Sequence, residues 1–299
     1  MIIDVFKSDL SSYPYISSYN FMMISDHILI GNDPTACAHK SMKNIKNGIN
    51  PERVKEGDIV YVITDRLPEF FRQIYPKIKN NFTLISGRTD NGLLNPFNTN
   101  KILKWYTSNL GIKNPKIEAI PLGIQNRHWK RMNNPEGEPD LIEQINQEII
   151  EKDKDVLMGF QPRTNPGVRQ AIYRKFKSEP FITKSPYTND DRKDISFRKK
   201  YYRDIKRHKF VLCPPGAGFD CHRNWETWAL GTYPIIKKHV SMENFYDMPA
   251  WFINNWNEVT QDNIYLKYQE LSNGNFNTDK IKFDYWYKKI TSDGSINKQ

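Results

Sequence analysis

Two short apolar runs separated by a helical pattern constrain the fold more than any other feature of this chain. Residues 59–64 (IVYVIT) and 82–86 (FTLIS) are rich in β-branched residues, and each run is followed by a polar turn. Between them, apolar residues recur at helical spacing from Phe70 to Ile78. Continuous apolar runs of this length are typical of strands buried in a parallel sheet. The segment therefore predicts a strand, a helix and a second strand.

The same alternation continues along the chain and predicts an α/β fold with two Rossmann-like domains, whose parallel sheets face a central cleft. We expect residues 1–130 to form the first domain, 131–153 a linker, 154–275 the second domain and 276–299 a C-terminal helix that packs back on the junction. The further strands are expected at 116–124, 156–160, 210–213, 233–236 and 251–254, and the further helices at 100–109, 140–152, 167–177, 220–230 and 280–290.

Charge and composition narrow the class of protein. The chain of 299 residues has 44 Lys and Arg against 34 Asp and Glu, a net charge of +10, which favours an anionic partner. The sequence contains no run of about 18 apolar residues, so it predicts no transmembrane helix. The first residues lack the pattern of a cleavable leader. Three cysteines, Cys37, Cys213 and Cys221, are too few for a disulfide framework. We expect a soluble cytoplasmic protein, unless an anchor lies outside this sequence.

The most informative segment is 209–238 (KFVLCPPGAGFDCHRNWETWALGTYPIIKK), which predicts a strand, a glycine-rich turn, a helix and a strand. Gly216 and Gly218 allow close approach of a ligand to the backbone, and the turn leads into a helix N-terminus, which favours phosphate. Asp220 is expected to cap this helix, and Gly231 to follow its end. The pattern is typical of an anion site.

Two charged side chains of this helix suggest that the anion is a nucleotide. Arg223 lies one turn into the helix, where its guanidinium can reach a diphosphate. Glu226, three residues later, lies on the same face and is suited to the ribose hydroxyls rather than to phosphate. The alternative is an ordinary ion pair on a helix surface, with glycines that serve only the turn.

These residues resemble the signature of the exostosin-like glycosyltransferases (glycosyltransferase family forty-seven). The resemblance covers about thirty residues and is fainter in the first half, at 61–65, 86–90 and 120–124. It rests on Pro214-Pro215-Gly216, Asp220, His222-Arg223, Trp225-Glu226, Gly231 and Pro234-Ile235-Ile236. This chain is shorter than the animal exostosins, and we expect in it neither their second transferase domain nor their membrane anchor, so the resemblance does not extend to their polymerase activity and substrates.

The resemblance implies a GT-B fold and an inverting transfer from a nucleotide-diphosphate sugar, such as a UDP- or GDP-sugar, to a glycan or glycoprotein hydroxyl, without metal or other cofactor. It assigns Arg223 to the diphosphate and Glu226 to the ribose, and it places the turn against the phosphates. The remaining donor-site candidates are Pro215, Gly216, Ala217, Gly218, Asp220 and His222. Arg163 and Arg169, which follow the first strand of the second domain, are diphosphate candidates or else solvated surface arginines.

An inverting transfer also needs a base for the acceptor hydroxyl, and we expect it from the first domain. Asp90 and Asp65 each follow a predicted buried strand, at the edge where α/β ligands gather. We rank Asp90 first, Asp65 second and Glu69 third. Each of these carboxylates has the alternative role of capping the helix that follows.

A metal site is not expected. Asp153-Lys154-Asp155 is the chain's match to the Asp-x-Asp of metal-dependent transferases, but it precedes its strand, so we interpret it as a solvated turn. The spacing of Cys213, Cys221 and His222 fits no common zinc site.

Two rival functions remain open. Residues 198–209 (RKKYYRDIKRHK) interleave basic residues with tyrosines, as in nucleic-acid-binding surfaces. A non-catalytic glycan-binding module would explain the aromatic residues but would not need a nucleotide pocket. We expect the transferase, with no nucleic acid as partner.

Overall fold

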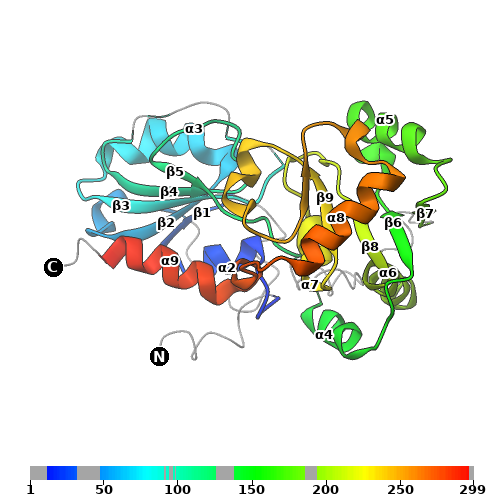
Figure 1. Ribbon diagram of the computed structural model, residues 1–299. Helices are drawn as coiled ribbons and strands as arrows, with labels where there is room; N and C mark the ends of the chain where they lie inside the picture. The colour runs from blue at the N-terminus through cyan, green and yellow to red at the C-terminus, as the bar shows by residue number, and fades with distance from the viewer. Residues whose placement is uncertain are drawn as a thin grey trace.

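Two parallel β-sheets of five strands each form the body of the protein (Figure 1). The computed structural model describes residues 12–31, 48–90, 92–93, 97, 99–125, 138–185 and 194–295. The first sheet has the order β1 (His27–Leu29), β2 (Asp58–Ile63), β3 (Phe82–Gly87), β4 (Ile102–Thr107) and β5 (Ile117–Ala119). The second has the order β10 (Trp251–Ile253), β9 (Tyr233–Lys237), β8 (His208–Leu212), β6 (Lys154–Met158) and β7 (Ile182–Lys184). The predicted α/β class with two Rossmann-like halves is confirmed.

Side chains of the first sheet alternate between two separate cores. Ile59, Tyr61 and Ile63 of β2 point to one face, whereas Val60 and Val62 point to the other. The second face is covered by the short helix α3 (Leu67–Glu69) and the π-helical turn η4 (Phe70–Ile74) that continues it. The first face is covered by α2 (Ser18–Met23) and by α9 (Phe283–Ser295), which comes from the far end of the chain (Figure 1).

Helix α9 is thus part of the first half of the molecule, although about 165 residues separate it from β5. Phe283, Trp286 and Ile290 are all buried, and the Phe283 ring packs edge-on against Phe21 with centroids 5.7 Å apart. The Phe283 amide also donates a hydrogen bond to the Pro14 carbonyl at 3.0 Å. The C-terminal helix therefore completes the core of the first sheet.

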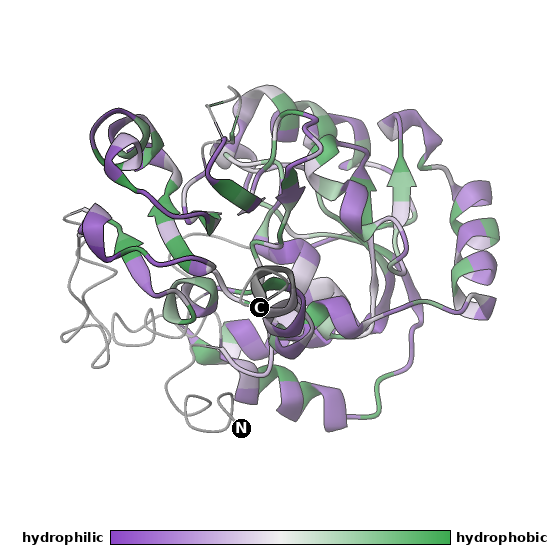
Figure 2. Cartoon of the chain, turned by 90° about the vertical axis from the view of Figure 1, so that its left-hand side faces the viewer, coloured by the Kyte–Doolittle hydropathy of each residue, from purple (hydrophilic) through white to green (hydrophobic). Residues whose placement is uncertain are grey.

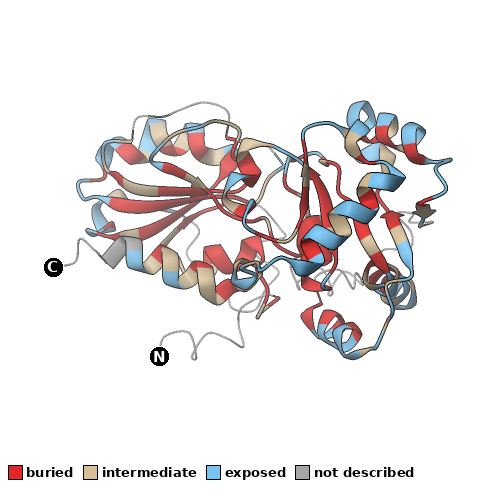
Figure 3. Ribbon diagram, in the orientation of Figure 1, coloured by how far each residue is buried: buried red, intermediate tan, exposed pale blue. Residues whose placement is uncertain are grey.

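Helices also cover both faces of the second sheet. Side chains of α5 (Pro166–Phe176) and α8 (Gln261–Asn273) pack on one face, and both helices expose their outer sides (Figure 3). The other face is covered by α4 (Pro139–Gln147), α6 (Ile195–Arg207) and α7 (His222–Ala229). In α7 every residue from Asn224 to Ala229 is buried. Helix α4, which lies in the expected linker, buries Leu141, Ile142 and Ile145 and so belongs to the core of this half.

The two halves share one core. The cluster that holds Tyr61 of the first sheet and Trp286 of α9 also holds Leu157, Val211 and Trp225 of the second half. Figure 2 shows the hydrophobic residues concentrated in the strands, whereas the helices alternate between hydrophilic and hydrophobic residues. The shared core ties the second half to the first.

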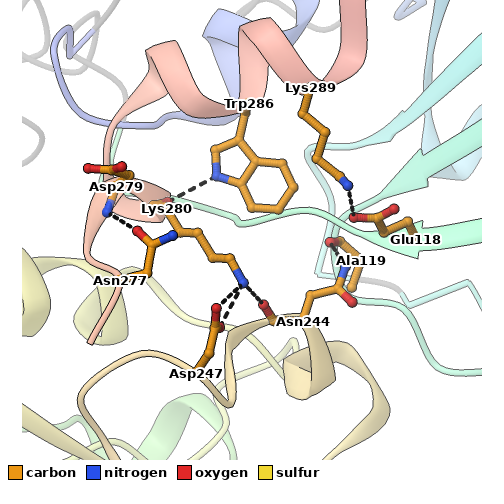
Figure 4. Close-up of polar contacts among 9 residues, drawn as sticks. All are labelled: Glu118, Ala119, Asn244, Asp247, Asn277, Asp279, Lys280, Trp286 and Lys289. Carbon is orange, nitrogen blue, oxygen red and sulfur yellow. Dashed lines mark hydrogen bonds and ion pairs between the residues drawn. The ribbon is translucent and has the colours of Figure 1, made fainter. Parts of the chain in front are cut away.

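Polar contacts strengthen the same junction (Figure 4). The Asn244 side chain, from the 3-10 helix η9 (Val240–Phe245), donates a hydrogen bond to the Ala119 carbonyl at the end of β5, at 2.9 Å. Lys280, just before α9, donates to the Asn244 carbonyl and to the Asp247 carboxylate, both at 2.7 Å. The second half is therefore connected both to the first sheet and to the segment that leads into α9.

The helix predicted at 100–109 is wrong, because Ile102–Thr107 is the strand β4 between β3 and β5. The pairing register shifts between Phe82 and Leu84 of β3, which pair with Ile102 and Trp105. This β-bulge places two inward side chains three residues apart instead of two. A spacing of three is the signature of a helix, so the bulge misled the pattern analysis. The sequence analysis also missed β1, β7 and α8.

One buried histidine gives a prediction for acid stability. His208 is 1% exposed, and burial lowers the pKa of its imidazole from 6.5 to about 4. The folded state therefore binds the proton less readily than the unfolded state, so stability is complete above pH 6.5 and falls as the pH is lowered from 6.5 to 4. The loss amounts to roughly 3 kcal/mol for this group. We expect His208→Asn to reduce the difference in urea unfolding free energy between pH 7 and pH 4.5.

The control for that experiment is His27→Asn, which removes a histidine that is paired with Asp58 at 2.8 Å near the surface. If His208→Asn and the parent protein lose the same stability on acidification, burial of His208 is not the cause.

Candidate functional site

The strand order of the second sheet locates a binding site. Counted within that half, the order is second, first, third, fourth, fifth, because β6 pairs with both β7 and β8. In sheets of this order, ligands bind outside the carboxyl ends of the first and third strands, where the connections diverge. Here these ends are followed by Gly159–Arg169 and by the glycine-rich turn at 213–220. Both segments were identified from the sequence as diphosphate candidates.

The structure brings these two segments together. The Asn165 side chain, which caps α5, donates to the Gly216 carbonyl at 2.8 Å. Arg169, also in α5, donates to the carbonyls of Pro214 and Pro215 at 3.1 and 3.0 Å. The turn is therefore held in place by α5 before any ligand arrives.

The glycines of the turn are required by neighbouring protein groups. A Cβ atom on Gly216 would lie 3.0 Å from Nη2 of Arg169, and one on Gly218 would lie 2.7 Å from Nδ2 of Asn109. The sequence analysis attributed both glycines to the approach of a ligand. In the structure, a side chain at Gly216 would collide with Arg169 of α5, and a side chain at Gly218 would collide with Asn109, which follows β4.

Arg169 is a buried cation, 5% exposed. Burial, followed by repulsion from Arg223, lowers the pKa of its guanidinium to about 10. Its hydrogen bonds go to backbone carbonyls, including that of Gln161 at 3.4 Å. Arg169 therefore stays protonated at neutral pH, and none of these partners carries a compensating charge. Its alternative role as a solvated surface arginine is wrong.

Arg223, in the first turn of α7, is the second cation of this pair. Its Nε donates to the Tyr201 hydroxyl and its Nη2 to the Gly159 carbonyl, both at 2.9 Å. Its Nη1 has no hydrogen-bond partner among the described residues. Burial raises the pKa of Tyr201 to about 12, so this hydroxyl stays neutral. Arg223 is therefore oriented by two neutral groups and keeps one end of its fork available.

No described carboxylate forms an ion pair with Arg169 or Arg223. Burial also raises the pKa of the nearby Cys213 and Cys221 thiols, so these remain uncharged. Two adjacent and partly desolvated cations repel one another, and an anion bound between them would relieve that repulsion. The pair is suited to a diphosphate.

Asp220 has a different place from the one expected. The N-cap of α7 is Cys221, whereas the carboxylate of Asp220, 3% exposed, points into the protein. It accepts hydrogen bonds from the Leu122 amide at 2.8 Å, from Nε1 of Trp225 at 2.8 Å and from Nδ2 of Asn224 at 2.9 Å. Its predicted capping role is wrong, and the residue joins the two halves. Gly231 has a φ of +66° just after α7, so its predicted place at the helix end is confirmed.

His222 and Glu226 are also held by the protein. The Nδ1 of His222 lies 2.7 Å from the Gly123 carbonyl of the first half, and must donate because a carbonyl only accepts. Glu226 is 5% exposed, accepts a hydrogen bond from Tyr202 at 3.1 Å and lies 3.5 Å from Arg198. Glu226 is thus paired with Arg198 in the interior, and not with Arg223 on the helix surface as the alternative supposed. The role of Glu226 at a ribose stays a prediction.

The candidate bases lie at the carboxyl edge of the first sheet. Asp90 and Asp65 are both exposed, after β3 and β2 respectively, whereas Glu69 is paired with Arg66 in the following turn. Asn109, after β4, donates to the Thr89 carbonyl at 3.2 Å and accepts from the Asp220 amide at 2.8 Å. Asn109 therefore connects the loop of Asp90 to the glycine-rich turn, so the carboxyl edges of the two sheets face each other.

The backbone at this edge is strained. Arg88 and Asn109, which follow β3 and β4, have φ values of +66° and +54°, a region that non-glycine residues rarely adopt. Such conformations gather at functional sites, where the surrounding structure enforces them. The positions of Arg88 and Asn109 therefore support a functional site at the carboxyl edge of the first sheet.

The remaining candidates lie around the turn. Pro215 is half-buried, Ala217 is exposed, and Arg163 is exposed in the 3-10 helix Pro162–Thr164.

In the part of the chain that the structure describes, no three His, Cys, Asp or Glu side chains are grouped to hold a metal ion. Asp153 and Asp155 are paired with Arg207 and Lys209. Cys37 lies outside the described residues. No described helix is long and apolar enough to cross a membrane.

Sequence reasoning missed Tyr201 and Asn109. Tyr201 belongs to the basic run at 198–209, whose tyrosines were considered as part of a nucleic-acid-binding surface and not as partners of the donor site. Asn109 lies more than 100 residues from its partner Asp220, and no local pattern signals such a contact.

Comparison with known proteins gives limited similarity. No family model matches the chain, and no curated protein matches it. A crystal structure of α1,3-fucosyltransferase with GDP-fucose is similar over 89% of this chain and 89% of its own, at 14% identity and a TM-score of 0.46. A crystal structure of α1,3-fucosyltransferase is similar over 90% of this chain and 88% of its own, at 16% identity and a TM-score of 0.47.

Proposed function

We propose that this chain is a glycosyltransferase that takes its sugar from a nucleotide-diphosphate donor, with Arg169 and Arg223 binding the diphosphate. One observation carries the proposal: two partly desolvated guanidinium groups that repel each other lie at the switch point of a parallel sheet, and no described carboxylate forms an ion pair with either. Such cations bind a diphosphate strongly, because they have lost much of their hydration on folding and little further desolvation cost arises when the ligand binds.

In the proposed reaction, the donor lies at the carboxyl edge of the second sheet and the base at the facing carboxyl edge of the first sheet. The acceptor hydroxyl attacks the anomeric carbon of the donor sugar, the bond to the diphosphate breaks, and the leaving group takes the electron pair. Arg169 and Arg223 stabilise the negative charge that develops on the diphosphate. A carboxylate on the opposite edge takes the proton of the hydroxyl. Attack from the face opposite the leaving group inverts the anomeric centre, and the guanidinium pair supplies the positive charge, so we propose an inverting reaction that needs no metal.

Asp90 is the proposed base. Its loop is joined through Asn109 to the glycine-rich turn, whereas Asp65 lies one strand further from that contact. We expect Asp90→Asn to lower kcat by about 100-fold to 10,000-fold, because general-base catalysis has this range. Donor affinity is expected to stay unchanged, since the carboxylate does not contact the diphosphate. Steady-state transfer assays and donor titration measure both effects.

Two further variants make that experiment decisive. Asp65→Asn tests the second-ranked base, and Asp279→Asn, at an exposed position before α9, is the control for loss of one surface carboxylate. A fully active Asp90→Asn protein with an inactive Asp65→Asn protein would transfer the assignment to Asp65.

The structure gives little support to the nucleic-acid alternative. Most basic side chains of the run at 198–209 are already engaged within the protein. Arg203 pairs with Glu148 at 2.7 Å and Arg207 with Asp153 at 2.5 Å, and both tyrosines of the run are buried. A surface that binds nucleic acid needs unpaired cations and exposed rings.

Nucleotide binding tests the proposal directly. We expect UDP or GDP, or one of their sugar conjugates, to raise the melting temperature of the protein more than CMP, which has no diphosphate, because a ligand that binds only the folded state stabilises it. Hydrolysis of the corresponding donor sugar supplies a second measurement. If no nucleotide shifts the melting temperature while RNA or DNA binds with a steep salt dependence, the transferase proposal is wrong. Glycan binding without nucleotide binding would favour the non-catalytic module.

A further inference from the structure

Phe219 is an exposed aromatic side chain in the middle of the candidate site. It is 39% exposed, although Gly218 and Asp220 on either side of it are both buried. Asn109 fixes the backbone here, because it packs against Gly218 and accepts a hydrogen bond from the Asp220 amide. The ring of Phe219 is therefore held at the surface by a rigid turn.

One face of this ring is already covered. The imidazole of His239, which follows β9, stacks on Phe219 with centroids 3.6 Å apart and planes 17° apart. The Nδ1 of His239 accepts a hydrogen bond from the Ser241 amide at 3.2 Å and lies 2.9 Å from the Ser241 hydroxyl. Nδ1 is thus deprotonated, and burial lowers the pKa of the imidazole, which keeps the ring neutral. His239 therefore supports one face of the Phe219 ring with a flat, neutral ring.

The Phe219 ring also lies beside the first half of the molecule. A Cβ atom on Gly92 would lie 3.7 Å from Cε2 of Phe219, and Gly92 is two residues after Asp90 in the chain. The diphosphate-binding arginines instead contact the carbonyls of Gly159, Pro214 and Pro215 in the second half. Phe219 therefore lies on the side of the site where the acceptor is activated.

We propose that Phe219, backed by His239, is the platform on which a pyranose ring of the acceptor stacks. This inference rests on the proposed transferase function. The face of an aromatic ring carries partial negative charge, and it attracts the C–H bonds that line one face of a pyranose. The rigid position of the ring lowers the entropy lost on binding. The acceptor is then a glycan, rather than the side-chain hydroxyl of a protein or a lipid alcohol.

The test separates the acceptor from the donor. With UDP- and GDP-sugars as donors and a panel of methyl pyranosides and disaccharides as acceptors, Phe219→Ala is expected to raise the acceptor KM about tenfold or more. Donor Kd and the rate of donor hydrolysis in water are expected to stay unchanged. Phe219→Tyr is expected to restore the acceptor KM, because it keeps the ring. Tyr265→Ala, which removes an exposed ring on α8, is the matched control.

Saturation-transfer NMR on the same panel supplies a readout without turnover. We expect signals from one face of a bound pyranose in the parent protein, and their loss in Phe219→Ala. Unchanged KM and NMR signals in Phe219→Ala would overturn the platform, as would a raised donor Kd, which would place the ring at the nucleobase. A parent protein that hydrolyses a donor but binds no pyranoside also overturns it. Failure of the parent protein to bind any nucleotide instead refutes the transferase function on which the platform rests.

Discussion

Replacing Arg223 with methionine is expected to lower the affinity for the nucleoside diphosphate by about 100-fold or more. In the proposed site Arg223 donates a charge-assisted hydrogen bond to the diphosphate through Nη1, and such a bond together with the lost cation is worth about 3 kcal/mol. Methionine keeps an unbranched apolar side chain in the place of the arginine stem. Its introduction removes the repulsion between Arg223 and Arg169 but also leaves the Tyr201 hydroxyl and the Gly159 carbonyl without their donor, so the stability of the fold is measured alongside binding. Isothermal titration with UDP and GDP measures the effect, and circular dichroism checks the fold.

A charge-matched control is available in the same half of the protein. Arg203→Met also removes one positive charge, but Arg203 lies at the surface in an ion pair with Glu148. We expect this variant to bind nucleotide as the parent protein does. Arg223→Lys adds a further comparison, because lysine keeps the charge but cannot reproduce the planar fork. Equal affinities in Arg223→Met and Arg203→Met would show that the diphosphate lies elsewhere.

Replacing Asp220 with alanine is expected to lower the free energy of unfolding by about 3 to 5 kcal/mol. The change leaves the Leu122 amide, the Trp225 indole and the Asn224 amide group buried without their acceptor. Each unsatisfied buried donor costs about 1 to 3 kcal/mol, and the costs are only partly additive because the groups share one site. The variant also removes a connection between the two halves. Urea denaturation measures the loss.

Asp262→Ala is the control for this variant, because Asp262 is exposed in the first turn of α8. Its loss is expected to cost about 0.5 kcal/mol through the helix dipole alone. Asp220→Asn, which retains one acceptor oxygen, is expected to fall between the two. If Asp220→Ala is no less stable than Asp262→Ala, the buried hydrogen bonds do not stabilise the junction.

Local patterns predicted the elements that local forces determine. The run at 209–238 has apolar strands, a glycine-rich turn and Gly231 after its helix, and the structure places β8, α7 and β9 there in that order. The failure at β4 has a local cause too, since a β-bulge imitates helical spacing. The strands β1 and β7 have three residues each and gave no signal, whereas β5 and β10, which are equally short, lie within the runs predicted at 116–124 and 251–254.

Contacts across the chain could not be predicted in the same way. The sequence identified Arg169 and Arg223 as candidates, but their lack of a described carboxylate partner depends on which residues fold around them. Glu226 was interpreted as a ligand-binding carboxylate on a helix surface, yet it faces Tyr202 and Arg198 from a neighbouring helix. A single sequence contains no signal for such pairings.

The return of α9 to the first sheet affects how the protein forms during synthesis. The first five strands leave the ribosome early together with α2, but the face of β2 that carries Ile59, Tyr61 and Ile63 lacks the cover that α9 supplies until residues near 290 have been made. The nascent first half therefore exposes an apolar surface while the second half is translated, and chaperones have a binding site there during that interval. A gene divided at 131–153 would give a first fragment that cannot close its core. A division after residue 275 would instead leave a short helical peptide that the larger fragment can capture.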